Sequence, residues 1–572
     1  MLLYNFKNIN IRIMNKLFML ATLMCCGMLL TSCSKDDKND GGSNTEGEVV
    51  LMYYALGGSD LDMSTEQALA NIAFYRKQYP NVRSFVQFKY SKERNKRWGT
   101  DYEPSGNYGE VYRFELNDNS LNPKYNGDVE EVKAFTGKGF QRIAGSDFKM
   151  YEPANIADFI NWCIEQAPNA KAYVLAFGDH GGGYDLMKDG VKTRGVMYDD
   201  NIEGGPCASN TEIATAIDAA KKHINVVFYD CCIMNNLEAL GELVGHTDYV
   251  FASGHSVAQN PLPDLCLALS KIPSAGTIDA GIRQHLGSYV NPALENMRRM
   301  HMKYISENRI GRSMDYTLTD MSKLPALFAS IKAVSDYLKQ YVATLSPAEL
   351  TARQDDFSEA ASDCYQYTNT DPLYDVVSYL NALENHVFAN DDQFDALVAN
   401  VETAAKQCQV AHAEYSINKD GTDRKYGLSY SIILGFNSKR LRPTAEVSSA
   451  HPIAEQGVIM HVVRAGKGDI DDPYYNAFLL ENGNVYFSVW NSGQEDRVLD
   501  INNYSQMHST PDNSWDKHYY TTVFDKATGW SGWFKLNPGI PYDNPPSDDE
   551  GNWVFENPNI NDIINGNVNI WQ

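Results

Sequence analysis

Residues 224–238 have the sequence INVVFYDCCIMNNLE, in which an apolar run passes directly into a helical pattern. Ile224–Tyr229 has the composition of a strand buried on both faces, and the residues from about Ile233 to Leu243 predict a helix. Similar strands are expected at 49–55, 82–90, 171–177 and 249–253, and helices at 64–78, 154–165 and 209–223. This alternation predicts βαβ units, that is, an α/β fold with a parallel sheet and helices on both faces.

The pattern changes along the chain and predicts five segments. A targeting segment is expected at 1–33 and a flexible tether at 34–48, where the sequence is acidic and rich in glycine. The parallel-sheet domain is expected at 49–300. A mixed α and β C-terminal region follows at 301–535, and residues 536–572, rich in Pro, Asn and Asp, predict a loop-rich tail.

The N-terminal segment has the pattern of a bacterial export signal. Leu17–Leu30 is a nearly unbroken apolar run, too short for a comfortable membrane span and typical of a secretory signal. It ends in Leu-Thr-Ser-Cys, which resembles the lipobox of bacterial lipoproteins, where the cysteine becomes the lipidated first residue. We therefore expect a lipid anchor at Cys33 that holds the protein on the cell envelope, at the outer membrane, with surface exposure left open. An ordinary secretory signal with a chance cysteine is the alternative.

Charge and cysteine content narrow the range of partners. A formal net charge of −24 argues against a nucleic-acid partner, because phosphate binding requires a basic face. Ten cysteines are present; Cys25 and Cys26 leave with the signal and Cys33 would be lipidated, so an odd number remains and at least one thiol is free. No cysteine spacing of zinc type occurs. We expect no metal or cofactor, although acidic loops such as Asp199-Asp200 leave calcium open.

Two segments place reactive residues at the ends of predicted strands. His180, in LAFGDHGGGY at 175–184, precedes three glycines, so unhindered N–H groups lie beside an imidazole, as an oxyanion site requires. Cys232 is expected to begin a helix, whose dipole would lower the pKa of the thiol. Each signal is weak alone, since a cysteine at a strand end is usually a buried structural residue. Together they stand 232 − 180 = 52 residues apart, close to the spacing of about 50 in caspase-type peptidases.

The combination AFGDHGGGY and VVFYDCCIMNNLE resembles the clostripain family of cysteine peptidases, whose pattern is His-Gly-x-Gly-Trp followed by Asp-Ala-Cys-Leu-Met. The resemblance extends roughly over residues 49–535. It implies a caspase-like fold and hydrolysis of protein or peptide substrates, with His180 as catalytic histidine and Cys232 as nucleophile. It also implies an oxyanion hole made by the N–H groups of Gly181 and Cys232, and an S1 pocket for Arg or Lys to which Asp230 contributes.

Some positions depart from the family pattern or have a second interpretation. Cys231 replaces the family's alanine and is expected to be a small buried neighbour of the nucleophile. Tyr184 replaces the tryptophan. After Ser253 the family has an acidic residue where this chain continues GHSVAQNPLPD, and this difference bears on Arg/Lys selectivity. Asp230 has an alternative role as the N-cap of the following helix.

Two rival functions compete with a cysteine endopeptidase. A serine esterase would use the His-Gly-Gly-Gly motif at 180–183 as its oxyanion loop and Ser256 as nucleophile, since Gly254–Ala258 approximates G-x-S-x-G. Against it, Pro261 and Pro263 interrupt the helix that must start at the nucleophile. The other rival is a surface-anchored binding lipoprotein that keeps the fold without the chemistry.

The segment MKDGVKTRGVMYDD at 187–200 lies between the two predicted catalytic residues. Its polar, glycine-flanked composition is typical of exposed loops that proteases nick. Members of the resembled family cut themselves in this interval, which implies autocleavage after Lys188, Lys192 or Arg194. An exposed loop that is never cut is the alternative.

Overall fold

A computed structural model describes most of the chain between residues 47 and 417 and parts of the remainder. The described residues are 47–58, 60–94, 102–122, 135–184, 187–188, 191–192, 195–199, 201–202, 205–257, 264–308, 312–365, 367, 373–417, 430–433, 444–446, 460–464, 474–481, 484–491, 497–500, 522–534 and 537. The chain separates into two compact units, Met1–Asn44 and Thr45–Gln572, and every described residue belongs to the second unit. The predicted signal and the lipidation residue Cys33 lie outside the described residues.

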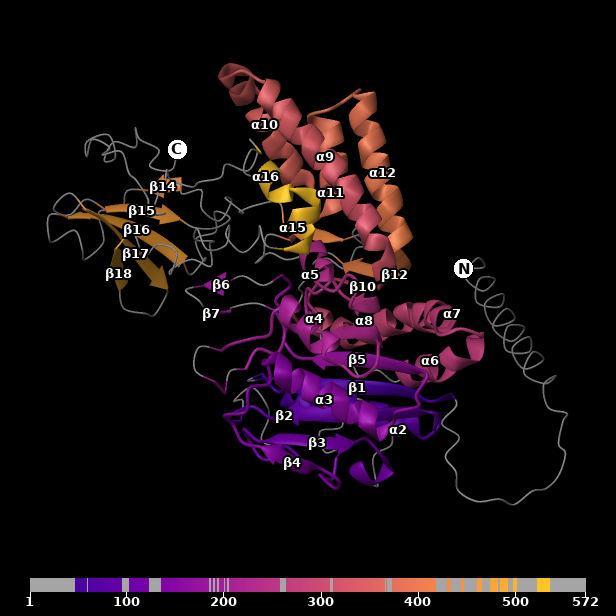
Figure 1. Cartoon of the computed structure of the whole chain (residues 1–572). Coiled ribbons are helices and arrows are strands. Elements are labelled where there is room, and N and C mark those ends of the chain that lie inside the picture. Colours follow the sequence, from indigo (N-terminus) through magenta and orange to yellow (C-terminus); the bar gives the residue numbers. More distant parts are fainter. Residues whose placement is uncertain are drawn as a thin grey trace, which may run out of the picture. The chain divides into compact units, whose positions relative to one another are not determined.

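Nine strands of the described chain form one central sheet, in the order β12-β10-β9-β8-β5-β1-β2-β3-β4 (Figure 1). The strands are β1 (Val49–Leu56), β2 (Val82–Lys89), β3 (Val111–Glu115), β4 (Gln141–Ala144), β5 (Ala172–Gly178), β8 (Ile224–Asp230), β9 (Thr247–Ala252), β10 (Arg312–Asp320) and β12 (Gln409–Ile417). The five central strands β9, β8, β5, β1 and β2 are parallel, and the strands outside them are antiparallel. The predicted α/β fold with a largely parallel sheet is confirmed.

The chain leaves β1 toward β2 on one side and returns to place β5 on its other side. The order of the strands therefore reverses between β1 and β5, and ligands of open parallel sheets bind at such a switch point, beyond the carboxyl ends of the strands. The fold thus indicates where to look for the site.

Both faces of the sheet are buried, which explains the continuous apolar runs in the central strands. All eight residues of β1 are buried. Successive side chains of a strand point to opposite faces, and accordingly Val50, Met52 and Tyr54 belong to one hydrophobic cluster. Val49, Leu51 and the other odd-numbered residues of β1 belong to the second cluster.

Helices cover the two faces as the alternating pattern predicted. They are α2 (Asp62–Arg76), α3 (Pro153–Gln166), α4 (Asn210–Asp218), α5 (Leu237–Gly241), α6 (Leu265–Lys271), α7 (Ile278–Gly281) and α8 (Gly287–Asn308). Side chains of α3 and α4 enter the cluster that contains Val50, and those of α2, α6 and α8 enter the cluster that contains Val49. The start of α4 is fixed by a capping box, in which Ser209 accepts from the backbone of Glu212 and the Glu212 carboxylate binds the Ser209 N–H.

The chain beyond residue 300 completes the same sheet and adds a helical layer. Strands β10 and β12 belong to the central sheet. The helices are α9 (Leu324–Thr344), α10 (Pro347–Asp363), α11 (Val376–His386), α12 (Asp392–Cys408), α15 (Val523–Thr528) and α16 (Trp530–Phe534) (Figure 1). The buried Phe524, Trp530 and Trp533 join the cluster that contains Val50, so the segment at 522–534 is part of the same core. The predicted boundary near residue 300 remains a prediction.

Three smaller sheets complete the described structure. One is antiparallel, in the order β14-β15-β16-β17-β18, and two are pairs, β6-β7 and β11-β13. Their strands are β6 (Met187–Lys188), β7 (Val191–Lys192), β11 (Leu373–Asp375), β13 (Ser431–Ile433), β14 (Thr444–Glu446), β15 (Met460–Arg464), β16 (Tyr474–Glu481), β17 (Asn484–Asn491) and β18 (Arg497–Asp500). None of the helices in the described ranges has the length and apolar character that crossing a membrane requires.

Candidate active site

The loops that follow β1, β5 and β8 meet at the switch point of the sheet. Pairing between strands places Ala55 of β1 opposite Gly178 of β5, and Gly178 opposite Asp230 of β8. The three strands therefore end at the same level. His180 follows two residues after Gly178 and Cys232 two residues after Asp230, so the register of the sheet brings these two sequence-predicted residues into neighbouring loops.

Gly181 packs directly against the backbone of Cys232. A Cβ atom at Gly181 would lie only 2.0 Å from the carbonyl oxygen of Cys232 and 2.7 Å from its nitrogen. No side chain fits at that separation, so the close approach of the two loops requires glycine here. The N–H of Gly181 also donates toward the Cys232 sulfur.

His180 is held by the loop that follows β1. Its Nε2 lies 2.9 Å from Oδ1 of Asp60 and 3.2 Å from the carbonyl oxygen of Gly58. The hydrogen bond to Asp60, more than any other influence, raises the pKa of His180 to about 9, although partial burial acts in the opposite direction. The imidazole is therefore positively charged at neutral pH. A carboxylate that orients a catalytic base is a recurring part of such sites.

Asp60 is a site residue that sequence reasoning missed. It lies in the turn GGSDLD at 57–62, after the first strand, where no site residue was predicted. The available signal was positional, because an acidic residue just beyond the carboxyl end of a parallel strand next to the switch point is placed to meet ligands or catalytic groups.

Cys232 lies in a turn, not at the start of a helix. The helix expected from about Ile233 begins only at Leu237 and ends at Gly241, with Asn236 as its N-cap. The expectation that a helix dipole lowers the pKa of this thiol is therefore wrong. Burial instead raises the pKa of Cys232, partly offset by N–H groups directed at the sulfur, including that of Val257 at 3.4 Å.

Among the described residues, the N–H of Cys232 donates to no backbone carbonyl. Together with the N–H of Gly181, it gives two backbone donors beside one sulfur, which is the chemical requirement of an oxyanion hole. Ile233, the next residue, has a φ of 50°. This left-handed conformation is unusual for a β-branched residue and marks the turn as strained.

Cys231 points the other way, into the core, as expected. It is fully buried, and its sulfur donates to the carbonyl oxygen of Phe177 in β5 at 3.3 Å. Burial raises the pKa of Cys231 well above that of an ordinary thiol. Of the two adjacent cysteines, only Cys232 is partly exposed.

Asp230 is fully buried at the end of β8. Its Oδ2 accepts a hydrogen bond from the Tyr53 hydroxyl at 2.5 Å. The alternative role as an N-cap is wrong, because the N-cap of α5 is Asn236, whose side chain accepts from the Ala239 N–H.

Ser256, the nucleophile of the rival esterase, is exposed but stands in a segment without helical structure. The next described helix, α6, begins at Leu265, whereas a nucleophile elbow leads directly into a helix. Pro261 and Pro263 lie outside the described residues. Ser256 directs its hydroxyl at the Cys232 sulfur, which makes it a neighbour of the cysteine and not an independent centre.

The segment after the expected cleavage sites runs beside the histidine loop. The N–H of Gly182 donates to Gly195 O at 2.8 Å, and Val196 forms a bridge with Gly181. Upstream, Lys188 and Lys192 lie in the hairpin β6-β7, where a loop was expected, with Lys188 paired to Val191. The third expected cleavage residue, Arg194, lies outside the described residues.

Asp199, in this same segment, has a buried cationic partner. Its Oδ2 lies 2.7 Å from the Nζ of Lys89, and both side chains are fully buried. A carboxylate paired in this way is a poor candidate for a calcium ligand. The described residues contain no cluster of three or more metal-ligating side chains, and Asp200 lies outside them.

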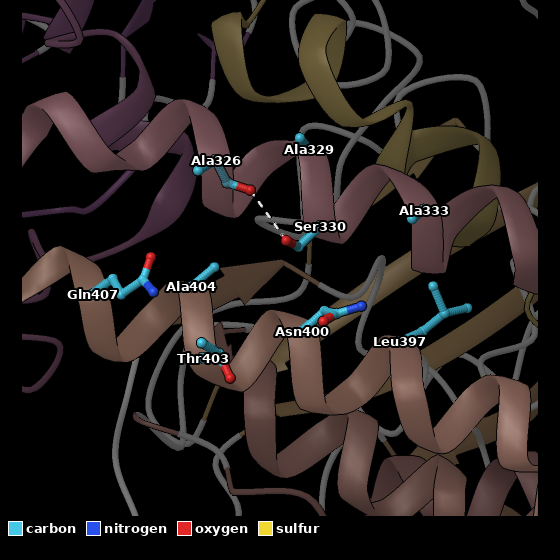
Figure 2. A pocket seen from close by; sticks show the side chains of 9 residues that line it. All are labelled: Ala326, Ala329, Ser330, Ala333, Leu397, Asn400, Thr403, Ala404 and Gln407. Atoms are coloured by element: carbon cyan, nitrogen blue, oxygen red, sulfur yellow. Dashed lines mark hydrogen bonds between the residues drawn. The ribbon is translucent and has the colours of Figure 1, made fainter.

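A groove elsewhere in the fold carries no catalytic chemistry. It lies between α9 and α12 (Figure 2) and is lined by small or uncharged side chains: Ala326, Ala329, Ser330, Ala333, Leu397, Asn400, Thr403, Ala404 and Gln407. It contains none of the candidate site residues. The loops at the switch point therefore remain the candidate active site.

Comparison with known proteins gives a match to a family profile. The profile of the clostripain family matches residues 123–442, which is more than half of the chain and includes both His180 and Cys232. No curated protein sequence matches.

Solved structures similar to the chain include proteases of Bacteroides thetaiotaomicron and Parabacteroides distasonis, which share little sequence with it. A secreted cysteine protease of Bacteroides thetaiotaomicron is 15% identical, with 67% of this chain and 93% of that chain covered and a TM-score of 0.41. The same type of protease in complex with an irreversible peptide inhibitor is 14% identical, with coverages of 68% and 94% and a TM-score of 0.42. An inactive zymogen from Parabacteroides distasonis is 15% identical, with coverages of 68% and 92% and a TM-score of 0.40.

Proposed function

The chain belongs to the clostripain family and is a cysteine peptidase; on that premise we propose that Cys232 and His180 form its catalytic dyad. The observation that carries the proposal is the convergence of their two loops at the switch point of the sheet, with Gly181 packed against Cys232. His180, whose pKa is raised to about 9, is protonated at neutral pH and so holds a proton that it can give to a leaving amine.

The proposed reaction has two steps. The Cys232 thiolate attacks the scissile carbonyl carbon, and the N–H groups of Gly181 and Cys232 stabilise the negative charge that develops on its oxygen. His180 then gives its proton to the leaving amine as the C–N bond breaks, which leaves a thioester and a neutral imidazole. That imidazole takes a proton from water, the resulting hydroxide attacks the thioester, and the acid product and the thiolate are released.

Substitution of the two adjacent cysteines tests the dyad. Cys232→Ala is expected to reduce peptide hydrolysis by about 10⁴-fold or more, since removal of a catalytic nucleophile has losses of this order. The matched control, Cys231→Ala, removes a buried sulfur from the core and should keep the turnover number. Ser256→Ala should keep most of the activity. The reverse result for the two cysteines contradicts the assignment, and loss of all activity in Ser256→Ala favours the esterase.

We further propose that the enzyme prefers Arg or Lys before the scissile bond and that Asp230 supplies the counter-charge. A buried carboxylate favours a cationic side chain strongly, because in a site of low polarity the attraction is weakly screened. Asp230→Asn should then reduce kcat/KM for Lys and Arg substrates much more than for uncharged ones. An equal loss for both classes would instead indicate that Asp230, with its Tyr53 partner, supports the fold alone.

We propose that the mature enzyme is anchored to the bacterial envelope, at the outer membrane, through lipid on Cys33. The support is the lipobox-like sequence before that residue. Cys33→Ala should move the protein from the membrane fraction to the soluble fraction. A protein that stays in the membrane fraction contradicts the anchor.

We also propose that catalysis needs no metal ion. The support is the buried ion pair between Lys89 and Asp199, which occupies the carboxylate that was considered as a calcium ligand. Treatment with a chelator should leave kcat/KM unchanged, and a loss that calcium restores contradicts the proposal.

A further inference from the structure

The turn that carries Cys232 is held in its strained conformation from outside. Ile233 has a φ of 50°, which costs free energy in a β-branched residue and persists only where surrounding contacts impose it. Its N–H donates to the carbonyl oxygen of His255 at 2.9 Å. His255 thus provides one of the contacts that fix the turn.

The segment 253–257, which follows β9, makes further contacts with the same turn. The N–H of Asn235 donates to Ser253 O at 2.9 Å. The N–H of Val257 lies 3.4 Å from the Cys232 sulfur, and the sulfur lies 3.5 Å from the carbonyl oxygen of Val257. The segment therefore contacts the turn on both sides of Ile233 and determines where the thiol lies.

This segment is held by one buried carboxylate on β10. Asp315 accepts hydrogen bonds from the Gly254 N–H at 3.0 Å, the His255 N–H at 3.2 Å and the Ser253 hydroxyl at 3.0 Å. It also accepts from Nδ1 of the His255 ring at 2.6 Å. Burial opposes ionisation of Asp315, but His255, His412 and the Gly254 N–H together lower the pKa of the carboxyl below its ordinary value.

The opposite side of the His255 ring is held by Tyr365. The Tyr365 hydroxyl lies 2.7 Å from Nε2 of His255, and the aromatic ring of Tyr367 packs on the imidazole with centroids 4.8 Å apart. His255, Asp315, Tyr365 and Tyr367 are all buried. The imidazole is consequently fixed at both nitrogens and on its face, with no freedom to rotate.

We propose that His255, fixed between Asp315 and Tyr365, is a positioning residue that holds segment 253–257 so that the strained turn presents the Cys232 thiol for attack. His255 does not touch substrate in this proposal. It acts through two backbone contacts, its own carbonyl oxygen on Ile233 and the N–H of Val257 on the Cys232 sulfur.

The proposal rests on the proposed role of Cys232, so its test measures the thiol directly. Tyr365→Phe removes one oxygen atom and frees one side of the His255 ring. Because a less well-placed Val257 N–H stabilises the thiolate less, the pH midpoint of Cys232 alkylation by iodoacetamide should rise. A rise of one unit corresponds to about tenfold slower alkylation at neutral pH, and kcat should fall while KM changes little. Asp230, whose charge also raises the pKa of the thiol, is unchanged in this variant.

Tyr367→Phe is the matched control. Its ring packs on the same imidazole, but its hydroxyl donates to Asp375 and not to His255. It should lower the melting temperature as much as Tyr365→Phe and leave the alkylation midpoint unchanged.

His255→Asn retains a donor near the position of Nδ1 and should recover part of the reactivity that His255→Leu loses. The proposal is overturned if Tyr365→Phe and His255→Leu lower only the melting temperature, with midpoint and kcat unchanged. The catalytic assignment can fail separately from this proposal. If the alkylation midpoint shifts in Tyr365→Phe but peptide hydrolysis survives in Cys232→Ala, the dyad is rejected and the positioning by His255 stands.

Discussion

The charge on His180 depends chiefly on Asp60, with smaller contributions from Asp179 and the carbonyl oxygen of Gly58. Asp60→Asn keeps the size of the side chain but removes the negative charge, so the pKa of His180 should fall from about 9 toward its ordinary value of about 6.5. The reaction requires a protonated imidazole for the leaving amine, so the alkaline limb of kcat/KM should move down in pH by a similar interval. The profile of kcat/KM against pH measures this shift. An unchanged limb would show that Asp60 does not set the charge of the histidine.

The pairing of His180 with Asp60 also makes the stability of the fold depend on pH. Because the pKa of His180 is raised in the fold, the stabilisation from its Asp60 partner is fully present below about pH 6.5 and is lost as pH rises through about 9. Burial raises the pKa of neighbouring Asp179 from its ordinary value of 3.8 to about 8, so the cost of ionising this carboxyl in the fold grows up to about pH 8 and adds to the fall in the lower part of this interval. The melting temperature of the wild type should fall between pH 6.5 and 9. Asp60→Asn should show a smaller fall, and an equal fall contradicts this account.

At the scale of elements, the contact between the loops after β5 and β8 depends on the absence of a side chain. Gly181→Ala would place a Cβ 2.0 Å from the Cys232 carbonyl oxygen, so one of the two loops must move. Loss of an oxyanion donor costs about 10²- to 10³-fold in kcat, and a loss of this order is expected. Gly287→Ala serves as control, because its Cβ would meet only ordinary contacts at 3.6 Å or more. Near-normal kcat in Gly181→Ala would argue against the proposed oxyanion hole.

Strand β2 is tied to the segment after the expected cleavage sites by the pair Lys89 and Asp199. Lys89 also donates to the carbonyl oxygens of Ser146 and Phe148. Lys89→Met leaves a buried carboxylate without its cation and should lower the free energy of unfolding by about 3–5 kcal/mol. Urea unfolding measures the loss. The double variant Lys89→Met with Asp199→Leu should recover much of it, and a double variant as unstable as the single one contradicts the pairing.

At the scale of the whole molecule, self-cleavage would leave two chains that share one sheet. The expected cuts after Lys188, Lys192 or Arg194 fall between β5 and β8, which are adjacent parallel strands with a continuous register. Gly195 and Val196, just beyond the last expected cut, contact the loop that carries His180. Purified wild type should therefore run as two fragments in denaturing gels and as one particle in gel filtration.

The activity of Cys232 should control this cleavage. Cys232→Ala should remain a single chain, as should a variant in which the three basic residues at 188, 192 and 194 are replaced by Gln. An active wild type that stays intact contradicts self-cleavage and leaves the peptidase assignment unaffected. Cleavage that persists in Cys232→Ala would instead show that another protease makes the cut.

The sequence alone determined the features that depend on neighbouring residues. The alternation of apolar runs and amphipathic helices predicted the parallel sheet, because strand and helix periodicities are local. The start of the helix expected at 209–223 is set locally as well, by a capping box between Ser209 and Glu212. His180 and Cys232 were singled out because each follows a predicted strand, and parallel strands end on one edge of the sheet. Their proposed roles, and that of Gly181, came from the resemblance to the clostripain family.

The tertiary structure decided the features that join distant residues. Asp60 lies 120 positions from His180 in sequence, Asp315 lies 60 from His255, and Tyr365 lies 110 from His255. No local pattern specifies such contacts, since the order and register of the strands create them. The pKa of Cys232 is likewise decided by the tertiary structure. A helix at Cys232 would have lowered it, but the chain forms a strained turn there, and burial, a property of the assembled fold, raises it instead.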